Sequence, residues 1–242
     1  MNELPAIRTV ELGPAARAAA LPFDENRSRA GEQYRIIRTK IIQHPLQPRL
    51  IVVTSPTSGD GKTVSSVNIA GALSLLRDTS VLLVDGDLRR CSVSALLGIP
   101  VAPGLADVLS GACEFSEAVV RLEEFPNLCV LPAGRVRANP TELLGSPQWK
   151  DLCQSFRKQF HSTIVDAPPV NGVADYDLLQ DLCDGVILIV RPDHTDRTLC
   201  VKAADAVPKS KLLGAVVNCV DEWFLWKSQE YYYGPGAPGD ES

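Results

Sequence analysis

The chain has 242 residues, 45% of them hydrophobic and 22% charged, a balance typical of a globular protein with a full hydrophobic core. Its net charge of -5 gives no general reason to expect nucleic-acid binding, so we predict no nucleic-acid partner. No apolar run approaches the roughly 20 residues of a membrane-spanning helix, and the start lacks a secretory signal, so we expect a cytoplasmic protein.

The first part of the chain is an arm, residues 1–25, that contains Ala and Pro and shows no clear period. From residue 26 to residue 44 the pattern becomes helical, with Tyr34, Ile37 and Ile41 at positions i, i+3 and i+7. A segment with two prolines then ends this helix.

Short apolar runs alternate with helical patterns through the rest of the main domain, which we place at residues 26–229. The expected strands are 50–54, 81–84, 128–131, 163–165, 186–190 and 215–217. The expected helices are 62–76, 104–109 with 116–122, 147–160, 175–182 and 195–207. This alternation predicts an α/β fold, a doubly wound and mostly parallel sheet with helices on both faces. Residues 230–242, rich in Gly, Pro, Tyr and acidic residues, are expected to form a flexible tail.

The first of these strands leads directly into the sequence SPTSGDGKT, and a helix follows. Gly59 and Gly61 let backbone N–H groups curl around phosphate oxygens, and the helix start adds partial positive charge. Lys62 supplies a full positive charge to the terminal phosphates, and the Thr63 hydroxyl is a ligand for magnesium. The pattern predicts a P-loop that binds a nucleoside triphosphate. The expected binding residues are Gly59, Asp60, Gly61, Lys62, Thr63 and Val64.

Two later strands end in aspartates. The strand in VLLVDGDLRR is followed by Asp85 and Asp87, whose carboxylates can face one place because alternate residues of an extended backbone point the same way. The strand in STIVDAPP ends with Asp166, the expected partner for magnesium. A single aspartate here would fit a turn equally well. Three of them at carboxyl ends of strands, where open α/β sheets bind ligands, indicate one site.

These segments resemble the bacterial tyrosine kinases of capsule and exopolysaccharide synthesis, over roughly residues 24–233. SPTSGDGKT is similar to the family's Walker A motif, in which a proline at the position of Pro56 is usual. VLLVDGDLRR is similar to its Walker A′ motif, and STIVDAPP to its Walker B motif, with Ala167 where Ser or Thr is commoner. The resemblance implies a P-loop NTPase fold and transfer of phosphate from ATP to protein tyrosine, with ATP and Mg²⁺ as cofactors.

The resemblance also implies a role for each site residue. Lys62 would neutralise charge on the β and γ phosphates, and Thr63, Asp87 and Asp166 would organise magnesium. Asp85 would accept or orient the tyrosine proton, although Asp87 could exchange roles with it. Asn218 follows the last expected strand. In related P-loop ATPases an asparagine there binds adenine, and a plain turn role is equally expected.

Two further segments match family features outside the nucleotide site. Glu32, Arg35 and Arg38 resemble the ExxRxxR oligomerisation motif, which implies contacts in a homo-oligomeric ring. By spacing alone, an ion pair on a solvated helix face is the simpler account. The tyrosines of the tail resemble the cluster that these enzymes phosphorylate in trans, although they could also be an aromatic tail that packs somewhere. They are Tyr231, Tyr232 and Tyr233.

The alternative function is that of a P-loop ATPase switch or scaffold of the partitioning type, without tyrosine kinase activity. Those proteins carry a second lysine five positions before the P-loop lysine, where this chain has Thr57. The Fe–S scaffold ATPases need a CxxC pair near the C-terminus, and Cys219 stands alone. For the kinase we expect a separate membrane chain-length regulator as activator, a tyrosine phosphatase, and a location at the inner face of the cell membrane through that partner.

Overall fold

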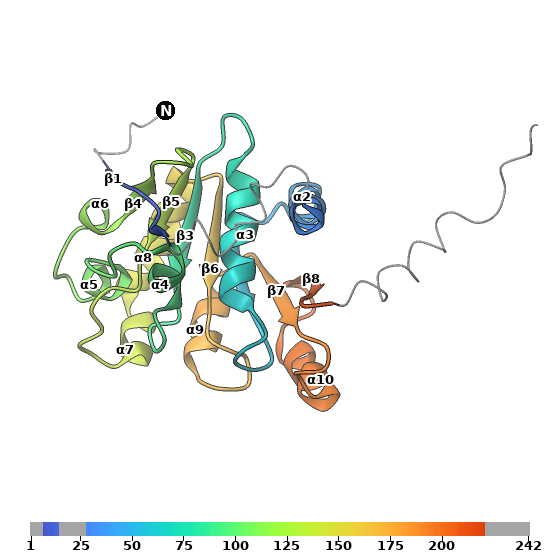
Figure 1. Ribbon diagram of the computed structural model, residues 1–242. Coiled ribbons are helices and arrows are strands. Elements are labelled where there is room, and N and C mark those ends of the chain that lie inside the picture. Colours follow the sequence, from blue (N-terminus) through green and yellow to red (C-terminus); the bar gives the residue numbers. More distant parts are fainter. Residues whose placement is uncertain (1–6, 15–27, 221–242) are drawn as a thin grey trace, which may run out of the picture.

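The computed structural model describes residues 7–14 and 28–220, and its central element is an eight-stranded sheet (Figure 1). The strand order is β1-β4-β5-β3-β6-β2-β7-β8. The strands are β1 (Arg8–Val10), β2 (Leu50–Thr54), β3 (Val81–Asp85), β4 (Val120–Leu122), β5 (Leu128–Leu131), β6 (Ser162–Asp166), β7 (Gly185–Val190) and β8 (Leu212–Val217). Only β4 and β5 pair antiparallel among these strands, which confirms the expected mostly parallel sheet.

Helices cover both faces of this sheet (Figure 1). They are α2 (Arg29–Ile42), α3 (Lys62–Ser74), α4 (Ser92–Leu97), α5 (Leu105–Leu109), α6 (Phe115–Ala118), α7 (Pro140–Leu144), α8 (Pro147–Gln159), α9 (Asp175–Asp181) and α10 (Arg197–Ala206). Alternate residues of β2 enter opposite cores: Val52 belongs to the core that includes Trp149 of α8, and Val53 to the core that includes Val67 of α3. The central strands are buried on both faces, which explains their continuous apolar runs.

The region around β4 differs from the sequence expectation. Residues 116–122 were expected to be helical, but the helix ends at Ala118 and residues 120–122 form β4. This strand pairs with β5 on one side and on the other with β1, which lies in the N-terminal arm where we expected no element. Val120 and Leu122 are buried and Arg121 is half-buried. This pattern over three residues suits a strand or a helix, so partners distant in sequence decided the outcome.

Within the described ranges, no helix is long and apolar enough to cross a membrane. The expected tail, with its three tyrosines, lies outside the described residues.

Candidate functional site

Three loops that follow neighbouring parallel strands form the candidate nucleotide site. β2 pairs with β6, and β6 pairs with β3, so the residues after these strands meet at the carboxyl edge of the sheet. Val53 lies opposite Asp166, and Asp166 lies opposite Asp85 in the register. The structure therefore brings Lys62, Thr63 and the three aspartates together, as the sequence predicted.

The P-loop backbone turns through left-handed conformations at its two glycines. Gly59 has a φ of 94° and Gly61 a φ of 89°, values that glycine adopts without strain. A Cβ on Gly61 would also lie 2.1 Å from Nδ2 of Asn218. Glycine is thus required there both by backbone conformation and by close packing.

Lys62 is buried. It is the first residue of α3, its relative exposure is 7%, and its Nζ lies 2.9 Å from Oδ2 of Asp87 and 3.9 Å from Oδ2 of Asp166. Burial lowers the pKa of Lys62, but the charges of Asp166 and Asp87 outweigh it and hold the pKa above its usual value. The ammonium group therefore stays charged, and its two carboxylate neighbours make its burial possible.

Asp166 is held by two hydroxyl groups from the same helix. Thr63 Oγ1 donates to Oδ2 at 2.7 Å, and Ser66 Oγ donates to Oδ1 at 3.0 Å. Burial raises the pKa of Asp166, against the lowering effect of Lys62. Our sequence reasoning missed Ser66. Its spacing of three residues from Thr63 was the available signal, because residues at i and i+3 share a helix face.

Asp85 is completely buried, and only one of its oxygens is satisfied. Oδ2 accepts a hydrogen bond from the backbone N–H of Val93 at 3.0 Å, and Oδ1 has no hydrogen-bond partner in the described part of the chain. Burial, followed by the charge of Asp166, raises the pKa of Asp85 to about 7. This carboxyl group can therefore gain or lose a proton near neutral pH.

The donor set fits magnesium that is shared with a nucleotide. Among residues 7–14 and 28–220, no three His, Cys, Asp or Glu side chains gather closely enough to hold a metal ion by themselves. Mg²⁺ commonly binds one or two carboxylates and takes its other ligands from substrate phosphates and water. Thr63, Asp87 and Asp166 offer such oxygens, all in contact with Lys62 or with each other.

A second set of contacts closes the P-loop from the β7 and β8 side. Asn218 Nδ2 donates to the backbone oxygen of Asp60 at 2.9 Å, and the Asp60 side chain accepts from Thr195 Oγ1. The ring of His194 contacts the backbone oxygen of Ser58 at 3.1 Å. Asn218 thus supports the P-loop directly, while its expected contact with adenine stays a prediction.

A network that the sequence did not reveal fixes the loop after β3. Arg89 Nε donates to Asp175 Oδ2 at 2.7 Å, and Thr141 Oγ1 donates to Asp175 Oδ1 at 2.6 Å. Burial would raise the pKa of Asp175, but these hydrogen bonds outweigh it and lower the pKa. Asp175 is the first residue of α9, and Ala174 is the N-cap of this helix.

The expected oligomerisation residues lie on α2. Arg35 Nε forms an ion pair with Glu32 Oε2 at 2.7 Å, as the simpler account predicted. Arg38 Nη1 donates to the backbone oxygen of Ala72 in α3 at 3.2 Å. Helix α2, which carries these three residues, therefore lies beside α3, and their role in contacts between chains stays a prediction.

Comparisons with known proteins identify the relatives of this chain. The family model of the CobQ/CobB/MinD/ParA nucleotide-binding domain matches residues 51–229. A tyrosine-protein kinase of Bacillus subtilis, YwqD, is 34% identical over 227 residues, covering 92% of this chain and 94% of its own length. The crystal structure of the chimerical protein CapA2B2 superposes with a TM-score of 0.79 at 26% identity, over 90% of this chain and 96% of that one. The septum site-determining protein MinD of Pyrococcus horikoshii, complexed with Mg-ADP, reaches a TM-score of 0.58 at 26% identity, over 70% of this chain and 68% of that one.

Proposed function

Because the chain belongs to the CobQ/CobB/MinD/ParA nucleotide-binding family, and within it to the bacterial tyrosine-protein kinases, we propose the following reaction. In this reaction the chain transfers the γ-phosphoryl group of ATP to tyrosines in the tail of a neighbouring copy. The observation that carries this proposal is the buried cluster of Lys62, Asp87 and Asp166 beside the P-loop. This cluster places a cation that can bind the phosphates next to carboxylates that can bind a metal ion or accept a proton.

The Lys62–Asp87 ion pair suggests how ATP prepares the site. The terminal phosphates would attract Nζ of Lys62, which Asp87 holds at 2.9 Å in this structure. When Lys62 turns to the phosphates, Asp87 would be released from the ion pair. Thr63, Asp87 and Asp166 would then hold magnesium, which would neutralise charge on the phosphates.

The tyrosine oxygen then attacks the γ-phosphorus, and the bond from that phosphorus to the β–γ bridging oxygen of ADP breaks. The phenol proton passes to a carboxylate, for which Asp85 is our candidate because its pKa of about 7 matches a base at neutral pH. Asp87, two residues further along the chain, can exchange this role with it. Lys62 stabilises the charge that develops on the transferred group.

The proposed biological setting follows the family resemblance. The chain would form a homo-oligomeric ring through Glu32, Arg35 and Arg38 of α2, in which each tail reaches a neighbour's site. A separate membrane chain-length regulator would activate it at the inner face of the membrane, and a tyrosine phosphatase would reverse the modification. The cycle would regulate the polymerisation and export of an exopolysaccharide or capsule.

The relatives disfavour the alternative of an ATPase switch. The curated relative with 34% identity is named a tyrosine-protein kinase, and MinD resembles the chain less closely than CapA2B2 does. Thr57 also stands where the switch proteins have their second lysine. Its backbone N–H and Oγ1 donate to Asp60 Oδ2 at 3.0 and 3.1 Å, so it serves the loop itself.

The test is to incubate the purified, dephosphorylated chain with Mg-ATP and to locate phosphate by mass spectrometry. We expect phosphate on Tyr231, Tyr232 and Tyr233, and none in a variant with all three changed to Phe. Hydrolysis of ATP without any phosphotyrosine would instead support the switch.

A further inference from the structure

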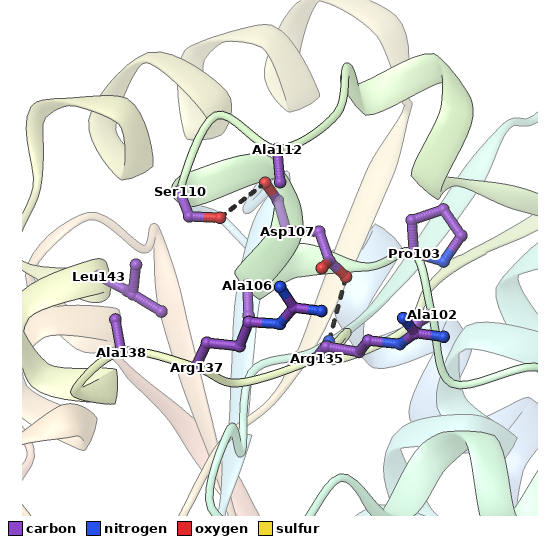
Figure 2. Close-up of a pocket in the computed structure, with 10 residues that line it drawn as sticks. All are labelled: Ala102, Pro103, Ala106, Asp107, Ser110, Ala112, Arg135, Arg137, Ala138 and Leu143. Atoms are coloured by element: carbon purple, nitrogen blue, oxygen red, sulfur yellow. Dashed lines mark hydrogen bonds between the residues drawn. The ribbon is translucent and has the colours of Figure 1, made fainter.

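A second pocket lies at the carboxyl edge of the sheet, outside the nucleotide site. It has a volume of about 310 Å³ and is formed by α5, by Leu143 of α7, and by the loops before α5 and after β5 (Figure 2). Its walls combine apolar side chains, among them Pro103 and Leu143, with the charged residues Arg135, Arg137 and Asp107. We call it the arginine pocket.

The frame of the arginine pocket is held by backbone contacts. The N–H groups of Leu105 and Ala106 donate to the carbonyl oxygens of the loop after β5 at 2.7 and 2.9 Å. Asp107 Oδ2 accepts from the backbone N–H groups of Gly104 and Arg135 at 2.9 and 3.1 Å. A Cβ on Gly104 would lie 2.4 Å from the backbone of that loop, so the two segments pack too closely for any larger residue. The arginine pocket is therefore preformed.

The cations of the arginine pocket come from alternate positions of one loop. Arg135 and Arg137 are two residues apart, and Figure 2 shows both side chains at the pocket, below Asp107 in the view. Both are exposed, and neither guanidinium has an ion pair or hydrogen bond within the described part of the chain. The lining also contains one acidic residue, Asp107, and one of its oxygens already accepts hydrogen bonds from two backbone N–H groups. With two arginines and one aspartate, the lining has a net charge of +1.

We propose that the arginine pocket binds a phosphotyrosine in the tail of a second copy of the chain. An aryl phosphate matches it in both parts: the ring suits the apolar wall, and the phosphate offers three acceptor oxygens to two guanidinium forks. It carries roughly -1.5 to -2 charge at neutral pH, against -1 without a ring for the tail's glutamate or aspartate side chains. This inference rests on the proposed function, because the proposed reaction makes the phosphotyrosine.

The arginine pocket lies beside the nucleotide site, so a phosphotyrosine bound there would keep the rest of the tail close to that site. The pocket's loop follows β5, the neighbour of β3 and three strands from β2, which places it on the order of 15 Å from the P-loop across the sheet. An extended peptide covers roughly 3.3 Å per residue, so the backbone from Tyr231 to Tyr233 covers about 7 Å, and the two side chains, pointing away from each other, must cover the rest of this span. A tail phosphorylated once is held in the arginine pocket while a further tyrosine of the cluster enters the nucleotide site.

The test measures binding of synthetic peptides to the dephosphorylated full chain without ATP. One peptide covers residues 228–242 with a single phosphate on Tyr232, and the other is the same peptide without phosphate. We expect the phosphopeptide to bind at least tenfold more tightly. The double variant Arg135→Gln/Arg137→Gln should remove that difference and leave binding of the unmodified peptide unchanged.

The matched control is Arg77→Gln/Lys158→Gln, which removes two exposed cations that precede β3 and β6 at the opposite edge of the sheet. It should bind both peptides as the parent does. Equal affinity for the two peptides, or equal phosphopeptide affinity in parent and Arg135/Arg137 variant, would overturn the proposal. Because the phosphate is installed by synthesis, this result does not depend on kinase activity, whereas the Mg-ATP experiment tests that activity alone.

Discussion

The nucleotide site and the arginine pocket lie at the same edge of the sheet but treat their charges differently. In the nucleotide site Lys62 and Asp87 are 7% and 1% exposed and bind each other. In the arginine pocket Arg135 and Arg137 are exposed and have no partner among the described residues. A buried ion costs several kcal/mol unless an opposite charge lies against it, whereas a hydrated guanidinium has no such cost. Internal pairing is therefore required in the first region, and the second can keep its charges for another molecule.

This difference implies different responses to mutation. A change in the nucleotide site alters both chemistry and stability, because Lys62 and the carboxylates of Asp87 and Asp166 support one another's burial. A change in the arginine pocket alters only what the chain binds.

Replacing the P-loop lysine should have the largest effect. We expect Lys62→Met to abolish tyrosine phosphorylation and to lower the free energy of unfolding by about 3 kcal/mol, because it leaves Asp87 and Asp166 buried without their cation. Phosphate incorporation and urea unfolding measure the two effects. In the control Lys62→Met/Asp87→Asn, much of the stability should return and the activity should not. Unchanged phosphorylation in Lys62→Met would remove our assignment of the site.

The pH dependence of the reaction tests Asp85. With a pKa of about 7, this carboxylate is increasingly protonated below neutral pH, so the phosphorylation rate should fall about tenfold from its plateau to pH 6. In Asp85→Asn the rate should be low and should lack this limb. A limb that persists in the variant would assign the titration to another group.

The same shift has a consequence for stability, with a definite sign. An acid whose pKa is raised in the folded state stabilises the fold at pH values below its unfolded pKa, and this contribution is lost as pH rises toward 7. The loss is on the order of 4 kcal/mol. Asp85→Asn keeps an acceptor for the N–H of Val93 and should lose less stability between pH 4 and pH 8 than the parent does. Equal loss in both proteins would contradict the raised pKa.

The arginine pocket should respond in the opposite way to the nucleotide site. We expect Arg135→Gln/Arg137→Gln to change the free energy of unfolding by less than about 0.5 kcal/mol, because both side chains are exposed. It should slow the second and third phosphorylations of the tail about tenfold relative to the first, the equivalent of about 1.4 kcal/mol of binding. Intact-mass spectrometry over time distinguishes these steps. A large loss of stability would show that the arginines belong to the fold.

The surface of α2 should give the smallest intramolecular effect. The Glu32–Arg35 pair, where Glu32 is exposed, contributes about 0.2–0.5 kcal/mol to the helix. If Glu32, Arg35 and Arg38 form the proposed ring contact, their joint replacement by Ala should yield monomers by light scattering, with slower phosphorylation in trans and unchanged ATP binding. Gln33→Ala/Lys40→Ala is the control on the same helix. The same particle mass for the triple variant and its parent would return these residues to the solvated-face account.

The sequence by itself determined the fold class and the centre of the site. Long apolar strands alternating with helices specify a parallel sheet, and the glycines, Lys62 and Thr63 of the P-loop are adjacent in the chain, so their geometry is local. The aspartates were predictable because a strand's carboxyl end is readable from its apolar run.

Only the tertiary structure decided the rest, because it depends on contacts between residues far apart in the chain. Lys62 is buried through an ion pair with a residue 25 positions away, and Asp175 receives Arg89 from 86 positions away. The periodicity of the sequence does not predict such pairs. It also does not predict that residues 120–122 form the strand β4 between β1 and β5. The arginine pocket likewise arises where the loop after β5 packs against the start of α5 and the segment before it, 27 to 33 positions earlier in the chain at their backbone hydrogen bonds.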